Sequence, residues 1–293
     1  MIPLKFIHKP EKEKEDCIKL YIDKLLEHTD KNKIDKLDSW CKNHLEYNSN
    51  PCSFKTIIQM PYEGILNVVD ELDLLLKKEL FPPEMQTYMN TLYETHVPRK
   101  DLVDILGETV CPYCNQMYIN RSNKHTICQF DHFFDKSTYP ILAVSFYNLI
   151  PCCGTCNLIK KNQMLDYSPY DENFTSADQL IKFDFEALDY TEMSGDKPLH
   201  KILVNYLNPK METNGKKLEL EEVYQIHTDE IQELILKQRM YGERYVDHLN
   251  KKYSQIGISL GRLVVGSYIS PDGYGKRPLS KMKTDIAKKL NII

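Results

Sequence analysis

The chain has 293 residues, of which 42% are apolar and 27% are charged, with 38 Lys and Arg against 42 Asp and Glu. This composition is typical of a globular protein with one large domain or two smaller ones, and it excludes collagen-like, low-complexity and wholly disordered chains. No apolar run approaches the roughly 20 residues that span a bilayer, and the N-terminus becomes charged too early for a signal peptide. We therefore expect a cytoplasmic protein with reduced thiols and no membrane partner.

The charge is unevenly distributed along the chain. The net charge is −4, yet residues 111–163 carry +3 and residues 270–293 carry +4, so two basic blocks lie within acidic surroundings. Such an asymmetry indicates where a polyanion would bind. For the lysines of the last block, a solvent-exposed helix face is the first interpretation and a DNA backbone contact is the alternative.

The first 107 residues predict a helical region. Apolar residues recur at helical spacing over 18–26, 34–45 and 65–76. Pro61 and the pair Pro82 and Pro83 lie where helices would begin, because proline is tolerated in a first helical turn. We expect four or five packed helices that end near Gly107.

The middle segment, 108–170, changes character. The stretch CPYCNQMYI, a turn over 121–124 and the stretch HTICQFDHFF predict a β-hairpin, because the second stretch is rich in β-branched and aromatic residues. An irregular loop and a short helix over 154–162 would follow. The aromatic residues of this segment are interpreted as packing, with a base-stacking surface as the alternative.

The last segment, 171–293, is mixed. Strands are expected over 199–207 and 217–223, a long helix over 227–249, and a basic terminal helix over 279–290. The chain as a whole is therefore predicted to be α+β: a helical region (1–107), a central module (108–170) and a mixed, helix-rich region (171–293).

Two CxxC pairs, separated by 38 residues, predict a structural zinc site. Two such knuckles supply the four thiolates of a tetrahedral zinc site, and clustered cysteines in a reduced chain favour metal over disulfides. Cys152 competes with its neighbour in the sequence CCGTC, but Cys153 preserves the CxxC spacing. The expected ligands are Cys111, Cys114, Cys153 and Cys156.

Between and beside these pairs lie Asp131-His132, Asn148 in NLIP, and Asn157 followed by Lys160 and Lys161. In this order, the roughly 50 residues from 111 to 161 resemble the HNH endonucleases, the ββα-metal nuclease family, in a zinc-stapled four-cysteine form with a His-Asn-Asn motif. The resemblance implies a ββα-metal fold for the central module and hydrolysis of phosphodiester bonds in nucleic acid, most commonly DNA.

The resemblance also implies roles for single residues. His132 would be the general base, a role that suits a side chain whose reference pKa is about 6.5. Asp131 and Asn157 would bind the catalytic metal, and these oxygen donors favour Mg²⁺ or Mn²⁺ over zinc. Asn148 would brace the loop between the second strand and the helix, and Lys160 and Lys161 would neutralise phosphates or form a solvated face.

The large flanks suggest that the module works with a partner. Stand-alone modules of this type resemble effector nucleases of bacterial anti-phage defence systems, which often act beside an ATPase or sensor protein, and no Walker-type phosphate loop occurs in this chain. Two alternatives stay open. One is a non-catalytic zinc module that binds nucleic acid or protein, and the other is an RNA-directed nuclease.

Overall fold

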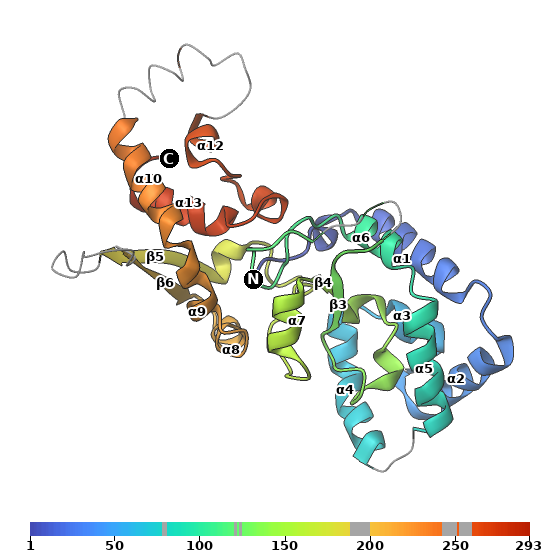
Figure 1. The fold of residues 1–293 in the computed structure, drawn as a ribbon. Coiled ribbons are helices and arrows are strands. Elements are labelled where there is room, and N and C mark those ends of the chain that lie inside the picture. Colours follow the sequence, from blue (N-terminus) through green and yellow to red (C-terminus); the bar gives the residue numbers. More distant parts are fainter. Residues whose placement is uncertain (78–80, 120–121, 123–124, 188–199, 242–250, 252–259) are drawn as a thin grey trace.

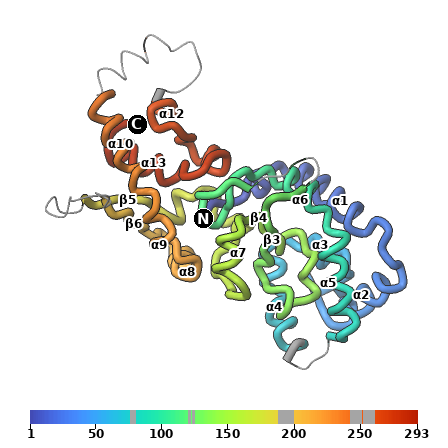
Figure 2. Tube along the Cα trace, viewed as in Figure 1, coloured from blue at the N-terminus to red at the C-terminus, as the bar shows by residue number. Residues whose placement is uncertain are grey.

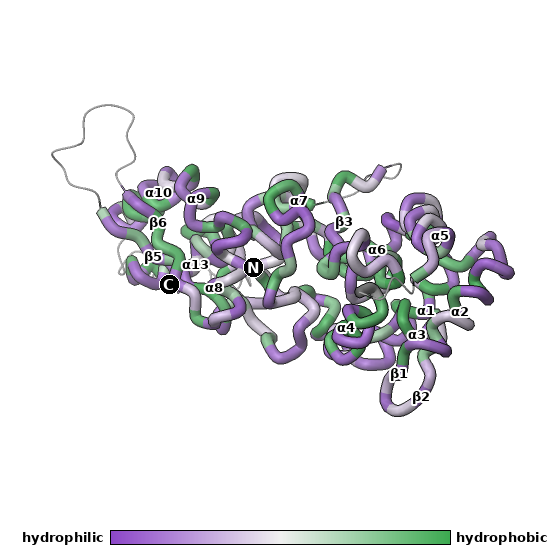
Figure 3. The backbone as a smooth tube through the Cα atoms, turned by 90° about the horizontal axis from the view of Figure 1, so that it is seen from below, coloured by the Kyte–Doolittle hydropathy of each residue, from purple (hydrophilic) through white to green (hydrophobic). Residues whose placement is uncertain are grey.

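The computed structural model describes residues 1–77, 81–119, 122, 125–187, 200–241, 251 and 260–293. It is a mixed α+β structure whose elements form two groups (Figure 1). Helices α1–α6 lie around strands β3 and β4 in one group, with helix α7 on the side that faces the other group. Strands β5 and β6 with helices α8, α9, α10, α12 and α13 form the other group. Viewed from below, the molecule is elongated and α7 lies between the two groups (Figure 3).

The N-terminal region is helical, as predicted, but its described residues form six α-helices rather than the four or five expected. They also form one short 3₁₀ segment (Lys5–His8) and a hairpin of two short strands, β1 (Glu46–Tyr47) and β2 (Asn50–Pro51). Its helices begin where the sequence supplies a cap or a proline: Asp30 and Ser53 accept hydrogen bonds from the first turns of α2 and α3, and Pro83 opens α5. Gly107 ends α6 in the left-handed conformation at φ +67°. The helices are α1 (Glu11–Leu26), α2 (Lys31–His44), α3 (Phe54–Gln59), α4 (Tyr62–Lys77), α5 (Pro83–Thr95) and α6 (Arg99–Leu106).

Two antiparallel strands in the first group are followed by a helix that packs on one of them. Strand β3 (Gln129–His132) pairs with β4 (Leu149–Cys152), and α7 (Gly154–Lys160) follows directly. The predicted hairpin between CPYCNQMYI and β3 is therefore wrong, because β3 takes its partner from beyond the following loop. Among the described residues, the first stretch makes only an isolated bridge between Val110 and Tyr118.

The second group is built on a longer hairpin. Strand β5 (Ile181–Ala187) pairs antiparallel with β6 (His200–Tyr206) along their full length, and α13 (Ser280–Lys289) packs on β5. The strand expected over 217–223 is instead helical, because Leu220 and Tyr224 bury one face of a short helix. The other helices are α8 (Pro209–Lys217), α9 (Leu220–Tyr224), α10 (Thr228–Met240) and α12 (Leu260–Val265).

Two predicted helices of this region are found at the expected places. Helix α10 starts within one residue of the predicted start, although residues 242–249 of that prediction lie outside the described residues. Helix α13 lies within the predicted 279–290. Lys281 is buried, so the expected solvent-exposed face is wrong for this residue, and it pairs with Asp285 at 2.6 Å. Lys283 pairs with Glu230 at 2.6 Å. These pairs favour a structural role over the DNA-contact alternative.

A continuous apolar core joins the three predicted segments. It includes Phe6, Ile57, Phe146 and Leu180, and the N-terminal residues run between the two groups (Figure 2). There the amide of Ile2 donates to the carbonyl of Pro112 at 2.8 Å. The boundaries at 107/108 and 170/171 stay a prediction. Within the described residues, none of the helices is both long and apolar enough to cross a membrane.

Candidate metal centre and catalytic pocket

The four predicted cysteine ligands come together in the structure. The Sγ atoms of Cys111, Cys114, Cys153 and Cys156 all lie within 4.8 Å of one another and all four residues are buried. A tetrahedral zinc site with Zn–S bonds of about 2.3 Å has S···S edges of about 3.8 Å. The Cys114–Cys153 separation is 3.8 Å, so the cluster could hold a structural zinc ion.

The backbone of each knuckle donates to its sulfurs. The amides of Gln116 and Cys156 point at Cys114 and Cys153, at 3.4 and 3.5 Å, and the thiols around Cys153 lower its pKa. Cys153 is the N-cap of α7, whereas Cys152 ends β4 outside the four-thiol cluster. The prediction that Cys153 rather than Cys152 belongs to the cluster is therefore confirmed.

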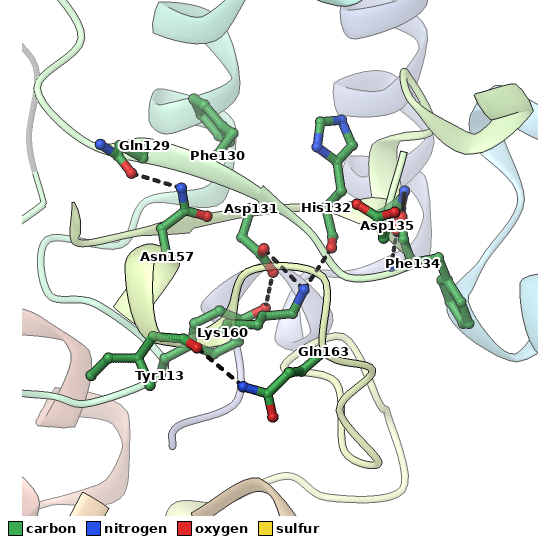
Figure 4. Close-up of polar contacts among 12 residues, drawn as sticks. Tyr113, Gln129, Phe130, Asp131, His132, Phe134, Asp135, Asn157, Lys160 and Gln163 are labelled. Atoms are coloured by element: carbon green, nitrogen blue, oxygen red, sulfur yellow. Dashed lines mark hydrogen bonds and ion pairs between the residues drawn. The ribbon is translucent and has the colours of Figure 1, made fainter. Parts of the chain in front are cut away.

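Strand β3 directs Asp131 and His132 to opposite sides (Figure 4). Asp131 turns toward the first knuckle and α7, where it is almost fully buried. Tyr113, which lies between the two cysteines of that knuckle, donates its hydroxyl to Oδ2 of Asp131 at 2.6 Å. Burial raises the pKa of Asp131, and Lys160 and Tyr113 oppose the rise. Tyr113 therefore connects the four-cysteine cluster to Asp131, because it follows Cys111 in the chain and hydrogen-bonds to the carboxylate.

Lys160 lies in the interior, not on the surface of α7, where both of its predicted roles, a phosphate contact and a solvated face, would place it. Its side chain is 0% exposed, and Nζ donates to Oδ1 of Asp131 at 3.0 Å and to the carbonyl of His132 at 2.8 Å (Figure 4). A buried ammonium is stable only when it is paired and hydrogen-bonded. Direct contact between Lys160 and a substrate phosphate would require breaking this ion pair. Lys161, the next residue, is exposed and lines the pocket described below.

His132 is held with one ring nitrogen available. Its Nε2 lies 3.0 Å from the carbonyl oxygen of Ala143 and must carry a proton to donate to it, which leaves Nδ1 as the acceptor. The ring of Tyr93 lies 4.4 Å from the imidazole, centroid to centroid. Burial lowers the pKa of His132 to about 4, so the ring is neutral near pH 7. A neutral, oriented imidazole is the form that can accept a proton.

Asn148 braces the stretch between the predicted second strand, HTICQFDHFF, and the helix, as expected. It is fully buried, accepts from the amide of Phe134 at 2.7 Å, and donates to the carbonyls of Phe134 and Leu142 at 3.0 and 2.9 Å. Those partners belong to the loop between β3 and β4, which follows the predicted second strand. Because this loop also carries Ala143, the partner of His132, Asn148 fixes the loop that orients the imidazole.

Asn157 presents its amide oxygen toward Asp131. Its Nδ2 donates to Oε1 of Gln129 at 2.7 Å, which turns the oxygen away from Gln129 and to the side of Asp131 (Figure 4). The two predicted oxygen donors therefore face the same space. Of these two donors, Asp131 is charged and Asn157 is neutral. The negative charge of Asp131 is balanced by Lys160.

A cavity of about 660 Å³ contains these residues. Asp131, His132 and Asn157 line it together with residues that sequence reasoning missed: Tyr93 and Glu94 from α5, Arg99 from α6, and Lys136 and Asp135 from the loop after β3. The N-terminal helices are therefore one wall of the pocket. No local pattern marks these residues, because only the fold brings α5 and α6 to β3.

The aromatic residues of the central module are packing residues in this structure. Phe133, Phe134, Tyr139, Phe146 and Tyr147 are all buried, which favours packing over the base-stacking alternative. The pocket itself is polar. It offers a proton acceptor, the two predicted oxygen donors Asp131 and Asn157, two further carboxylates and three cationic side chains. Comparison with known proteins found no matching family model, no matching curated protein and no matching solved structure.

Proposed function

We propose that this chain is a metal-dependent HNH endonuclease that hydrolyses phosphodiester bonds of nucleic acid, with DNA as the first candidate substrate. The observation that carries the proposal is the placement of Asp131, His132 and Asn157 in one polar cavity. The cavity is built on two antiparallel strands followed by a helix whose N-cap belongs to the four-cysteine cluster. The non-catalytic alternative gives no reason for these three residues to line one cavity.

His132 would act as the general base. Hydrolysis of a phosphodiester needs a water molecule that loses its proton as it attacks phosphorus. Nδ1 of His132 can take that proton, since Nε2 is engaged with Ala143 and burial keeps the ring neutral. Tyr93 and the loop braced by Asn148 hold the imidazole in place and act as positioning residues.

Asp131 and Asn157 would hold Mg²⁺ or Mn²⁺. The donor set fits these ions, because Mg²⁺ commonly binds through one or two carboxylates and completes its shell with waters and substrate phosphate. The ion would supply positive charge to the phosphate and the leaving oxygen when it is bound. Lys160 shares Asp131, so the protein's own ammonium lowers the net charge that the ion would meet. We therefore expect weak metal binding without substrate.

The four cysteines would hold zinc as a structural staple. The cluster fixes the first knuckle against the start of α7, and Tyr113 of that knuckle fixes Asp131. Loss of the metal would therefore disturb the catalytic pocket as well as the local fold.

Cleavage of plasmid DNA by the purified chain tests the proposal. The wild type is incubated with Mg²⁺ or Mn²⁺ beside His132→Ala and a matched variant of a histidine outside the pocket, His44→Ala. We expect cleavage by the wild type and the His44 variant and its loss in the His132 variant. Equal cleavage by all three, or no cleavage of DNA or RNA under any metal condition with any required partner present, contradicts the proposal. Labelled RNA in competition decides between the two polymers.

We further propose that the nuclease is the effector of a bacterial anti-phage defence system and is controlled by a partner such as an ATPase or sensor protein. The support is the overall charge of −4, which opposes strong intrinsic affinity for nucleic acid. Co-expression with the product of a neighbouring gene should make cleavage conditional. Full, regulated activity of the isolated chain would contradict this part of the proposal.

A further inference from the structure

Two cations lie against the ring of Tyr93 at the wall of the pocket. The guanidinium carbon of Arg99 lies 4.8 Å from the ring centroid, and Nζ of Lys136 lies 4.5 Å from it. Both residues line the cavity that holds His132, and the ring itself contacts the imidazole. Positive charge is therefore concentrated beside the residue expected to activate water.

Arg99 is fixed by the backbone at the end of α5. Its Nη1 and Nη2 donate to the carbonyls of Glu94 and Tyr93, at 3.0 and 2.9 Å. A guanidinium has five N–H donors, so these two bonds orient the group without using all of its donors. Arg99 is thus held in a defined position and can still donate to an anion.

One carboxylate bridges the two cations. Oε1 of Glu94 lies 3.2 Å from Nζ of Lys136, and Oε2 of the same side chain lies 3.5 Å from Nη2 of Arg99. The Glu94 side chain is 61% exposed, and those of Arg99 and Lys136 are 29% and 33% exposed. Ion pairs with this exposure are weak, so another anion can replace the carboxylate at small cost.

We infer that Arg99 and Lys136 form a binding site for a phosphate of the nucleic-acid backbone and that Glu94 occupies this site in the free protein. A carboxylate held between two cations is chemically similar to a phosphate that bridges them, and Arg is well suited to both anions. On strand binding the phosphate takes the place of the Glu94 carboxylate, which swings into solvent. The inference deepens the proposed function, since it names the residues that bind the substrate backbone and the group that competes with it.

Binding of a fluorescently labelled DNA duplex to the full chain tests this inference, measured by anisotropy without Mg²⁺ or Mn²⁺ and with the protein-bound zinc left in place. Glu94→Gln removes the competing charge, so we expect binding to tighten by about two- to fivefold, the strength of one exposed ion pair. Arg99→Gln and Lys136→Gln should weaken binding. Each should also reduce the slope of log K against log salt by about 0.9, the loss of one phosphate contact.

An exposed ion pair on α8 supplies the matched controls. Glu212→Gln and Lys216→Gln change the same charges away from the pocket and should leave DNA binding unchanged. A tighter Glu94→Gln variant cannot result from misfolding. Unchanged or weaker binding by Glu94→Gln, or Arg99 and Lys136 variants that bind like the controls, would overturn the inference.

Failure of this inference can be distinguished from failure of the proposed nuclease function. If DNA is cleaved in a His132-dependent way but Glu94→Gln binds DNA with the affinity of the wild type, the nuclease proposal stands and this inference fails. If DNA is never cleaved and Glu94→Gln still tightens binding, the phosphate site stands and the catalytic proposal fails.

Discussion

Replacing Lys160 by methionine should destabilise the protein far more than the loss of an ordinary lysine. Lys160 is completely buried and neutralises Asp131, which is 4% exposed, at an Nζ–Oδ1 distance of 3.0 Å. Methionine keeps most of the side-chain volume but removes the charge and both hydrogen bonds, to Asp131 and to the carbonyl of His132. The carboxylate would keep Tyr113 as a donor but would lose the one cation that pairs with it in the described part of the chain.

The magnitude follows from what stays buried. Removing one partner of a buried ion pair costs about 3–5 kcal/mol, because the other charge is left uncompensated or must take up a proton. An exposed pair is worth about 0–1 kcal/mol, so Lys216→Met on α8 is the matched control. The double variant Asp131→Asn with Lys160→Met leaves no buried charge and should regain part of the lost stability.

Urea unfolding of the zinc-loaded protein, followed by circular dichroism, measures these free energies of unfolding. We expect a loss of about 3–5 kcal/mol for Lys160→Met and about 1 kcal/mol or less for Lys216→Met. If the two variants lose equal stability, or if the double variant is less stable than Lys160→Met, then the buried pair is not the organising contact of this site.

Three further predictions concern other parts of the molecule. The wild type should carry one zinc ion per chain by metal analysis, and Cys153→Ser should lose it while Cys128→Ser, outside the cluster, should keep it; retention by both variants would refute the assignment. Burial raises the pKa of Glu108 to about 7, so the folded state holds its proton more tightly than the unfolded state and stability falls as pH rises from about 4.5 through 7. Glu108→Gln should abolish up to about 3 kcal/mol of this fall, measured by urea unfolding at pH 5 and pH 8, and an unchanged pH dependence would contradict the cause given. Asn148→Ala should lower the free energy of unfolding by about 3 kcal/mol, roughly 1 kcal/mol for each hydrogen bond lost. It should also lower any cleavage rate while leaving the zinc content unchanged. A stability equal to that of the wild type would show that these hydrogen bonds do not stabilise the loop.

Local chemistry made part of this fold predictable. Pro61 and Pro83 precede or open helices, and Gly107 ends one, because the backbone preferences of these residues act within a single turn. The choice of Cys153 over Cys152 likewise follows from the geometry of one knuckle. Such features need no knowledge of distant contacts.

The errors arose where distant contacts decide. The partner of β3 lies beyond a loop of 16 residues, and the pairing of two strands depends on what else covers them. The stretch 217–223 alternates apolar and charged residues like a strand, yet Leu220 and Tyr224 also fit one face of a helix, and tertiary packing selected the helix. Lysine is usually exposed, so the sequence predicts an exposed Lys160. Its burial is favourable because Asp131 lies within ion-pair distance.

The candidate site was partly predictable for the same reason. Asp131, His132 and Asn157 were identified from the resemblance to the HNH endonucleases, and they line one cavity. Arg99 and Glu94 come from helices whose sequence shows only amphipathic spacing. Their place in the pocket depends on how α5 and α6 pack against β3, which no local pattern specifies.

The rate of plasmid cleavage by His132→Ala relative to the wild type, at equal zinc content and with Mn²⁺ or Mg²⁺ and any required partner present, tests the central claim most directly. Loss of a general base should lower the rate by about 10²- to 10⁴-fold without unfolding the protein. A folded, zinc-loaded His132→Ala variant that cleaves as fast as the wild type would contradict the account.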